Sequence, residues 1–372
     1  MSEIVLHPSN WLYNAGVIGF LNSLERFEGK DPTAYLPNDG VAKIPRDLFT
    51  SLRCEDRYFD SDKKIASIVG KNVLYRNFLQ PNQRELFKSF VRSLNLVTSG
   101  EICNLCGSGK WLPDHKIVDL NQQDPARRND TKFLYRIRNF SIIHNSLLGP
   151  SLNEFPNAFW GLRQSATICH LCSFLIIHHH LALTSLSDGS EIFINAPSFK
   201  VMYYMNKFVR EVFGAPSPTE ARTKREILAM SVIEYAAKMR TTLGVWTGMN
   251  IEVVSRCGSK VEFFSLPYEV IQLLADRRIA SLLSQIGEFA ILDLVLDQDF
   301  SRLMELGYRL LRIGLKPSVE RGESEDRFVK DTLRLEKNRQ NPQRVAEQIF
   351  KLCAFVEDQR RRRCMHEHIS FA

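Results

Sequence analysis

The sequence predicts an α+β protein: a mixed α/β domain over residues 1–266, carrying an inserted zinc finger of four cysteines, followed by a helical bundle over residues 267–372. Three observations predict this class. Short extended and helical segments alternate in the first part, two C-x-x-C motifs lie between Cys103 and Cys172, and apolar residues recur at helical spacing after Pro267. With 372 residues, 44% of them hydrophobic, the chain can bury two cores.

The two cysteine motifs pair Cys103 with Cys106 and Cys169 with Cys172. Two intervening residues let a tight turn aim both sulfurs at one point, and Gly107 relaxes the backbone after the first turn. Four thiolates make the tetrahedral set of a structural zinc site and leave no position for a catalytic water. We therefore expect one structural Zn²⁺ on these four cysteines. The alternative is a set of unrelated buried cysteines or disulfides.

Composition and charge exclude some classes of protein. The segment Met1–Ile4 lacks the start of a signal peptide, and the apolar run Phe174–Leu183 is interrupted by histidines and too short to span a bilayer. Eight cysteines, four of them in the two motifs, fit a reducing cytoplasm better than a disulfide scaffold. We expect a cytoplasmic protein without membrane contact. The net charge of +7 is compatible with an anionic partner but does not require one.

The first helix is expected over Asn10–Leu24, with a short polar residue at its start accepting from free N–H groups. Ala15, Gly16 and Gly19 form a small-residue face on it. Because each glycine costs about 1 kcal/mol in a helix, close packing must compensate. We expect this face to pack against the N-terminal sheet; a direct ligand contact is the alternative.

Alternating elements are expected after this helix. Residues 43–49 and 73–78 are predicted to be extended or turn segments, and apolar spacing predicts a helix over 83–96 that ends by Gly100. Further predictions are a helix over 174–186, a strand over 191–195, a helix over 198–212, a linker over 214–219, a helix over 219–243, and a hairpin of 251–255 with 261–265.

A basic segment lies between the two cysteine motifs, where cations alternate with Phe133, Tyr135 and Phe140. Its cationic residues are Arg127, Arg128, Lys132, Arg136 and Arg138. Cations neutralise phosphate and exposed aromatics stack on bases, so the mixture suits a nucleic-acid groove. A half-buried strand with a solvated basic face is the competing interpretation.

Three consecutive histidines follow the second motif, His178, His179 and His180. Four thiolates already complete the metal site, and consecutive helical residues point in different directions. We therefore expect a histidine cluster at the edge of the core rather than additional ligands.

The end of the chain carries a run of four arginines, Arg360, Arg361, Arg362 and Arg363. The run can hold a phosphate backbone, or it can cap the last helix, where positive charge opposes the helix dipole. The sequence leaves both interpretations open.

One string in the chain resembles a known family. The segment Asn10–Gly19, with sequence NWLYNAGVIG, is similar to the opening of the large-subunit family of the subtype I-B CRISPR effector complex (Cascade). The two cysteine motifs and a helical C-terminal part occur in the same order in that family. The resemblance touches the beginning, middle and end of the chain, but only the opening string and the cysteine motifs are specific.

The resemblance implies a non-catalytic subunit that binds the 5′ end region of a CRISPR RNA and recognises the protospacer-adjacent motif in target double-stranded DNA. Implied partners are the Cascade backbone and 5′-handle-binding subunits, small subunits, and a nuclease-helicase or transposition proteins acting in trans. The residues 267–372 would resemble a small subunit, and Met230, Met239 and Met249 are possible internal starts for a separate one. The resemblance also favours the nucleic-acid interpretation of the basic segment.

Two other classes compete with this interpretation. A zinc-stabilised HNH-type nuclease is suggested by Asp114 and His115 after the first motif, but the gap to the second motif is too long for that compact site. A zinc deaminase is disfavoured, because the sequence lacks the His-x-Glu and Pro-Cys-x-x-Cys signature of that class. A zinc-organised protein-interaction scaffold is compatible with the composition.

Overall fold

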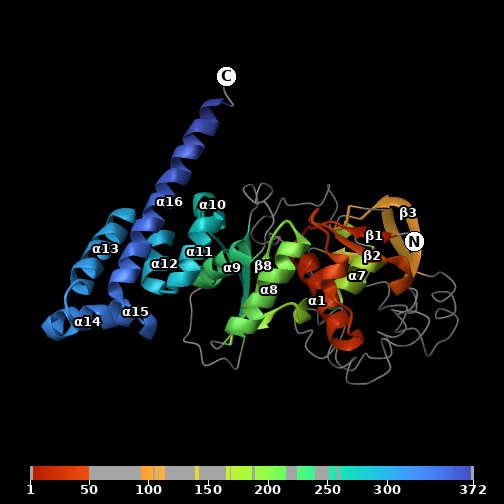
Figure 1. Cartoon of the computed structure of the whole chain (residues 1–372). Coiled ribbons are helices and arrows are strands. Elements are labelled where there is room, and N and C mark those ends of the chain that lie inside the picture. Colours follow the sequence, from red (N-terminus) through yellow and green to blue (C-terminus); the bar gives the residue numbers. More distant parts are fainter. Residues whose placement is uncertain are drawn as a thin grey trace. The chain divides into compact units, whose positions relative to one another are not determined.

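A computed structural model describes residues 3–49, 94–103, 105–107, 109–113, 139–141, 165–167, 169–186, 189–214, 224–238, 251–257 and 260–369. Helices are combined with small sheets, and a helical region ends the chain, which confirms the α+β class (Figure 1). The chain forms two compact units. The first consists of Met1–Arg210, Gly214–Pro216 and Val254–Phe263, and the second of Glu211–Phe213, Ser217–Val253 and Phe264–Ala372.

The first unit is built around helix α1 (Trp11–Glu28). Every residue from Trp11 to Leu24 is buried, as expected for a helix packed on all sides. Asn10 caps its start by accepting from the Leu12 N–H at 2.9 Å, and Gly29 ends it with a positive φ of 64°. The predicted helix is thus confirmed and extends one turn further than expected.

A small sheet and a short helix flank α1 in the sequence. Strand β1 (Glu3–Leu6) pairs antiparallel with β2 (Ala42–Pro45), and the 3₁₀-helix η1 (Pro32–Tyr35) precedes β2. Alternate residues of both strands are buried, so one face of the pair contributes to the core. Residues 46–49, which follow β2, are helical rather than extended.

The glycine face of α1 packs against another helix, not against the sheet as predicted. Helix α7 (His170–Ile177) continues into the 3₁₀-helix η6 (His179–Leu181), and both contact α1. A Cβ built on Gly16 would lie 2.7 Å from the Leu175 oxygen, and one on Gly19 would lie 1.9 Å from the His178 oxygen. The two glycines therefore allow a backbone contact that no larger residue permits.

Two predictions around the cysteine motifs are corrected. The end of the helix predicted over 83–96 is instead part of strand β3 (Leu94–Ile102), which also contains Gly100. Leu94 and Leu96 fit the alternation of a strand as well as the spacing of a helix. Residues 83–93 lie outside the described residues. The predicted helix over 174–186 already ends at Ile177.

The histidines explain the early end of α7. The His178 Nδ1 donates to the Phe174 oxygen at 2.9 Å, and the His179 Nδ1 donates to the Ile176 oxygen at 2.9 Å. Side chains thus satisfy carbonyls of the last turn, so no further helical N–H is needed there. After η6 the chain turns into the short strand β7 (Thr184–Ser185).

A four-stranded sheet of order β10-β9-β8-β7 contains β8 (Glu191–Asn195), β9 (Glu252–Cys257) and β10 (Lys260–Ser265). The predicted strand over 191–195 and the predicted hairpin are confirmed. Helix α8 (Phe199–Phe213) follows β8 as predicted, and its Asn206 side chain bonds both the N–H and the carbonyl of Ile194. Asn14 of α1 donates to Asn195 at 2.9 Å, which ties the central helix to the sheet.

The second unit is mainly helical in its described residues and also includes the ends of β9 and β10. Its helices are α9 (Lys224–Lys238), α10 (Tyr268–Ala275), α11 (Arg277–Ile286), α12 (Phe289–Leu296), α13 (Phe300–Gly314), α14 (Glu323–Thr332), α15 (Glu336–Gln340) and α16 (Pro342–Ile369), with the 3₁₀-helix η8 (Ser318–Glu320). Helix α9, predicted over 219–243, packs on α10 and α11 and belongs to this unit. Helices α13 and α16 lie side by side (Figure 1).

A buried carboxylate organises the end of the helical unit. Glu288 is 4% exposed and accepts from the N–H groups of Arg334 and Leu335 and from the Asn338 amide at 2.7–3.0 Å. These charge-assisted bonds fix the chain between α14 and α15. None of the helices in the described ranges combines the length and apolar character needed to cross a bilayer.

Enlarging the glycine face should destabilise the first unit. We predict that Gly19→Ala lowers the free energy of unfolding by at least about 1 kcal/mol. The backbone atoms of the two helices must move apart, and the cost of this shift exceeds the gain in helix propensity. Urea unfolding measures the difference. Arg26→Ala, at an exposed position of the same helix, is the control and should change it by less than about 0.5 kcal/mol. Equal stability of Gly19→Ala and the native chain would contradict the packing.

Buried His178 should make the first unit sensitive to acid. Desolvation lowers the pKa of His178 from 6.5 to about 3, so the folded ring stays neutral while the unfolded ring takes up a proton below pH 6.5. Its contribution to stability is complete above pH 6.5 and declines as the pH falls toward 3. Between pH 7.5 and 5.5 we expect a loss of about 1 kcal/mol from this ring.

The variant His178→Gln keeps an amide donor but cannot titrate, so its urea stability should fall less over this pH range. Metal content is measured in the same samples, because thiolate ligands also take up protons in acid. An identical decline in the variant, at equal metal content, would assign the pH dependence to other groups.

Candidate metal centre

Four cysteine sulfurs meet in the first unit. The Sγ atoms of Cys103, Cys106, Cys169 and Cys172 all lie within 4.8 Å of one another, and the four side chains are at most 3% exposed. The Cys103 and Cys172 sulfurs are 3.8 Å apart, and those of Cys106 and Cys169 are 4.0 Å apart. The structure thus brings together all four residues that the sequence predicted as ligands.

These separations match a metal cage and not a pair of disulfides. A disulfide holds its sulfurs about 2.05 Å apart, roughly half the distances found here. Four sulfurs bound tetrahedrally to zinc at about 2.3 Å lie about 3.8 Å from one another. The four cysteines can therefore bind one metal ion, and the set is compatible with structural zinc.

Each pair of ligands comes from a defined local structure. Strand β3 pairs antiparallel with β4 (Gly109–Pro113), and the turn between them carries Cys103 and Cys106. Gly107 has a positive φ of 66°, and its N–H donates to the Cys103 oxygen at 3.0 Å, which closes this turn. The predicted role of this glycine is confirmed.

The second pair stands at the start of a helix. Strand β6 (Ser165–Thr167) pairs antiparallel with β5 (Asn139–Ser141) and leads the chain to Cys169, the N-cap of α7. Cys172 lies in the first turn of α7, and its N–H donates to the Cys169 sulfur at 3.4 Å. The N–H of Cys169 donates to the Cys103 sulfur at 3.2 Å. Backbone donors and the helix N-terminus stabilise thiolates, so the local fold favours the charged ligands.

The thiol pKa values show why a cation is needed. Contacts with the other sulfurs lower the pKa of Cys103 well below its usual range. The pKa of Cys106 is about 7, because contact with Cys103, which raises it, is outweighed by contacts with Cys169 and Cys172. Burial raises the pKa values of Cys169 and Cys172. Four buried thiolates repel one another, so full ionisation requires a bound cation.

Comparison of the chain with family models, with curated proteins and with solved structures finds no match. All four positions of a tetrahedral ion are occupied by protein sulfurs, which is the arrangement of structural sites.

The three histidines lie beside the centre but are not part of it. Among the described residues, the candidate metal cluster in this region consists of the four cysteines alone. His178 and His179 are fully buried and His180 is 9% exposed, so they lie deeper than the core edge that the sequence predicted. The His178 ring packs edge-on against Phe20 and Phe174, with centroids 5.4 and 4.8 Å away. The His178 ring is thus a packing group between α1 and α7.

The predicted nucleic-acid residues have two different outcomes. Arg127, Arg128, Lys132, Arg136 and Arg138 lie outside the described residues, as do Asp114 and His115. Arg360, Arg361, Arg362 and Arg363 all lie in α16, and the side chain of Arg363 is outside the description.

The described arginines of this run already have intramolecular partners. Arg360 lies over the Phe300 ring at 4.6 Å, Arg361 pairs with Glu357 at 3.2 Å, and Arg362 pairs with Asp358 at 2.9 Å. The acids stand four residues earlier in α16. Arg361 and Arg362 are 75% and 62% exposed, so a competing anion can reach both.

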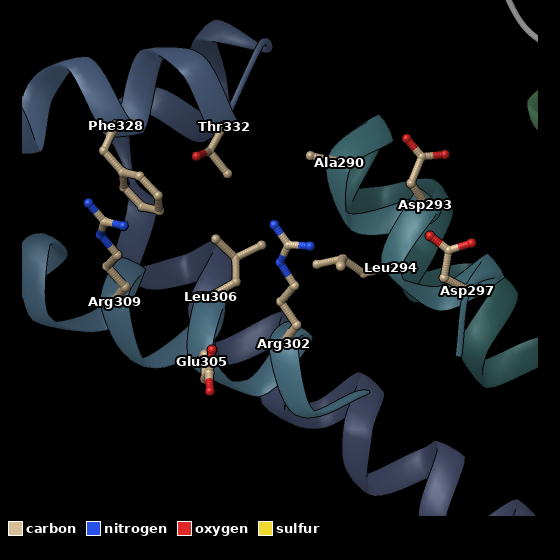
Figure 2. A pocket seen from close by; sticks show the side chains of 10 residues that line it. All are labelled: Ala290, Asp293, Leu294, Asp297, Arg302, Glu305, Leu306, Arg309, Phe328 and Thr332. Atoms are coloured by element: carbon tan, nitrogen blue, oxygen red, sulfur yellow. The ribbon is translucent and has the colours of Figure 1, made fainter. Parts of the chain in front are cut away.

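A pocket of about 500 Å³ opens in the helical unit between α12, α13 and α14. Figure 2 shows Arg302 and Leu294 directed toward one another across it, and Arg309 lying against Phe328. The Arg309 guanidinium is 3.6 Å from the centre of that ring. The sequence analysis did not single out this pocket.

The charges of the pocket do not favour a phosphate polymer. Its lining combines two guanidinium groups with three carboxylates, namely Arg302, Arg309, Asp293, Asp297 and Glu305. Phosphate backbones require an excess of cations. A peptide segment that carries both charges fits this lining better.

Replacing any one ligand should empty the centre. We predict one zinc ion per native chain purified without chelators, and loss of that ion in Cys103→Ala or Cys172→Ala, because three thiolates leave an incomplete tetrahedral set. Elemental analysis measures the zinc, and limited proteolysis reports whether residues 94–186 lose structure. Cys353→Ala, at a free and half-buried cysteine elsewhere, is the matched control and should keep its zinc. A native chain without zinc would refute the prediction.

Proposed function

We propose that the chain is the non-catalytic large subunit of a type I-B CRISPR RNA-guided surveillance complex, and that its cysteine centre binds one structural Zn²⁺. In this role it binds the 5′ end region of the CRISPR RNA and recognises the protospacer-adjacent motif in duplex DNA. Sequence choice along the target is left to RNA pairing.

One observation carries the non-catalytic part of the proposal: the ligand set is complete. Four buried sulfurs surround the metal position, so a bound zinc ion has no free coordination site for water or substrate. Such an ion stabilises the fold and holds the segment between the two motifs at fixed ends. This supports a platform more than a metal-dependent hydrolase.

The RNA-guided part of the proposal rests on the resemblance of the opening string. Residues of that string lie in α1, which is buried and packs on the metal-binding helix α7. The string and the cysteine motifs, the two specific parts of the resemblance, thus belong to one packed structure. Their co-occurrence has a physical reason, because α1 supports the helix that carries two ligands.

A zinc-organised interaction scaffold is the second candidate, and the mixed-charge pocket of the helical unit favours it. In this alternative the chain binds a protein segment and no nucleic acid. The proposed complex also needs protein partners, so the pocket is compatible with both candidates; nucleic-acid binding decides between them.

Purification of the chain with the proteins encoded by its neighbouring genes tests the proposal. We expect RNA of about one repeat-spacer unit in length to co-purify, together with the backbone subunits. Absence of RNA and of duplex binding at moderate salt supports the scaffold. Metal-dependent DNA cleavage that is lost in His115→Ala supports a nuclease instead.

Charge reversal in the basic segment should weaken duplex binding. We predict that replacing Arg127, Arg128, Lys132, Arg136 and Arg138 with glutamate lowers affinity and reduces the slope of log affinity against log salt by about 1 per lost phosphate contact. Fluorescence anisotropy with a labelled duplex at several salt concentrations measures both quantities.

The matched control reverses the same number of charges in the first unit, at Arg26, Lys30, Lys200, Lys207 and Arg210. It has the same net charge as the test variant and should keep the native salt slope. If both variants change the slope equally, the effect is one of net charge and the basic segment has no specific role.

A further inference from the structure

Tyr13 of α1 is a buried side chain that lies outside the two cysteine motifs. Its ring is 0% exposed and packs edge-on against Phe199, with centroids 6.4 Å apart. Its hydroxyl is also buried and has no hydrogen-bond partner among the residues that the structure describes. A buried hydroxyl without a partner destabilises the fold, so a function for it is expected.

The packing of α1 on α7 places Tyr13 next to the ligands. Gly16 meets Leu175 and Ile176, and Gly19 meets His178. The step from Gly16 to Gly19 on α1 matches the step from Leu175 to His178, three residues in each case, so the two segments run in the same direction. The same register, taken one turn back from Gly16, brings Tyr13 to the level of Cys172.

The direction of the side chain agrees with this placement. Long side chains on a helix lean toward its N-terminus, and the N-terminus of α7 carries both Cys169 and Cys172. Burial raises the pKa of Tyr13 well above 10.0, and the negative charges of the cysteines, Cys172 foremost, raise it further. A tyrosine hydroxyl carries its proton at neutral pH and can act as a donor.

An occupied centre needs such a donor. One Zn²⁺ and four thiolates carry a net charge of −2, which is costly in a buried place unless hydrogen bonds reach the sulfurs. The backbone donors described above reach the Cys103 and Cys169 sulfurs. The register of α1 and α7 puts Tyr13 at the level of Cys172, whose sulfur these two backbone donors do not reach.

We propose that the Tyr13 hydroxyl donates a hydrogen bond to a cysteine thiolate of the metal-bound centre and thereby tunes its affinity for the ion. Tyr13 is a positioning residue that acts through the ligand. The inference rests on the proposed metal site and adds a residue from outside the two cysteine motifs.

Cobalt substitution tests the inference on the full chain. Co²⁺ in a four-thiolate site gives a sulfur-to-metal charge-transfer band whose energy depends on hydrogen bonds to the sulfurs. Tyr13→Phe removes one oxygen and keeps the ring against Phe199. We expect its band to move to longer wavelength, because an unbonded thiolate gives up electrons more readily. Zinc affinity, measured by competition with a chelator, should fall about 10- to 100-fold.

Tyr203→Phe is the matched control. The Tyr203 ring is 1% exposed, and its hydroxyl faces the Glu25 carboxylate at 3.4 Å rather than the cysteines. Its band and zinc affinity should equal those of the native chain. Tyr13→Met, which keeps apolar bulk without a hydroxyl, replaces Tyr13→Phe if that variant does not fold.

The outcomes separate the two proposals. A native chain that binds neither Co²⁺ nor Zn²⁺ would disprove the metal site itself. A native chain that binds both ions, with an unchanged band and affinity in Tyr13→Phe, would overturn the role of Tyr13 and leave the metal site intact.

Discussion

The mutual approach of four cysteine sulfurs is the constraint on which the first unit depends. Cys103 and Cys172 are 69 positions apart in the sequence, yet their sulfurs lie at 3.8 Å. A permanent cross-link closing a loop of this size would stabilise the folded chain by about 4 kcal/mol, whereas a metal ion held only by the folded chain contributes its binding free energy. The thiolates repel one another without a cation, so this stabilisation depends on the metal. Binding of a metal ion at this site would therefore be coupled to folding.

The coupling reaches the N-terminal helix through backbone contact. Gly16 and Gly19 let α1 lie directly against Leu175 and His178, immediately after the second ligand pair. Asn14 then ties α1 to the four-stranded sheet through Asn195. The candidate metal centre, the central helix and the sheet thus form one continuous packed structure.

The metal ligands could be predicted from the sequence because their chemistry is local. A C-x-x-C turn aims its own sulfurs, and only the meeting of the two turns depends on the fold. The partner of the glycine face could not be predicted, since many distant segments can offer a backbone. The same limit applies to Tyr13. Its position depends on how α1 packs against α7, and Tyr13 and Cys172 are 159 positions apart in the sequence. The partners of Arg361 and Arg362 were visible in the sequence, as Glu357 and Asp358 stand one helical turn earlier.

The two cysteine turns enclose the long segment of chain between Cys106 and Cys169, and the length of this segment can vary. Loop-closure entropy grows only with the logarithm of length, so doubling such an excursion costs only about 0.6 kcal/mol. Because the four sulfurs anchor both of its ends, the stretch between β4 and β5 can be lengthened at small energetic cost. Insertions there would leave the four sulfurs in place.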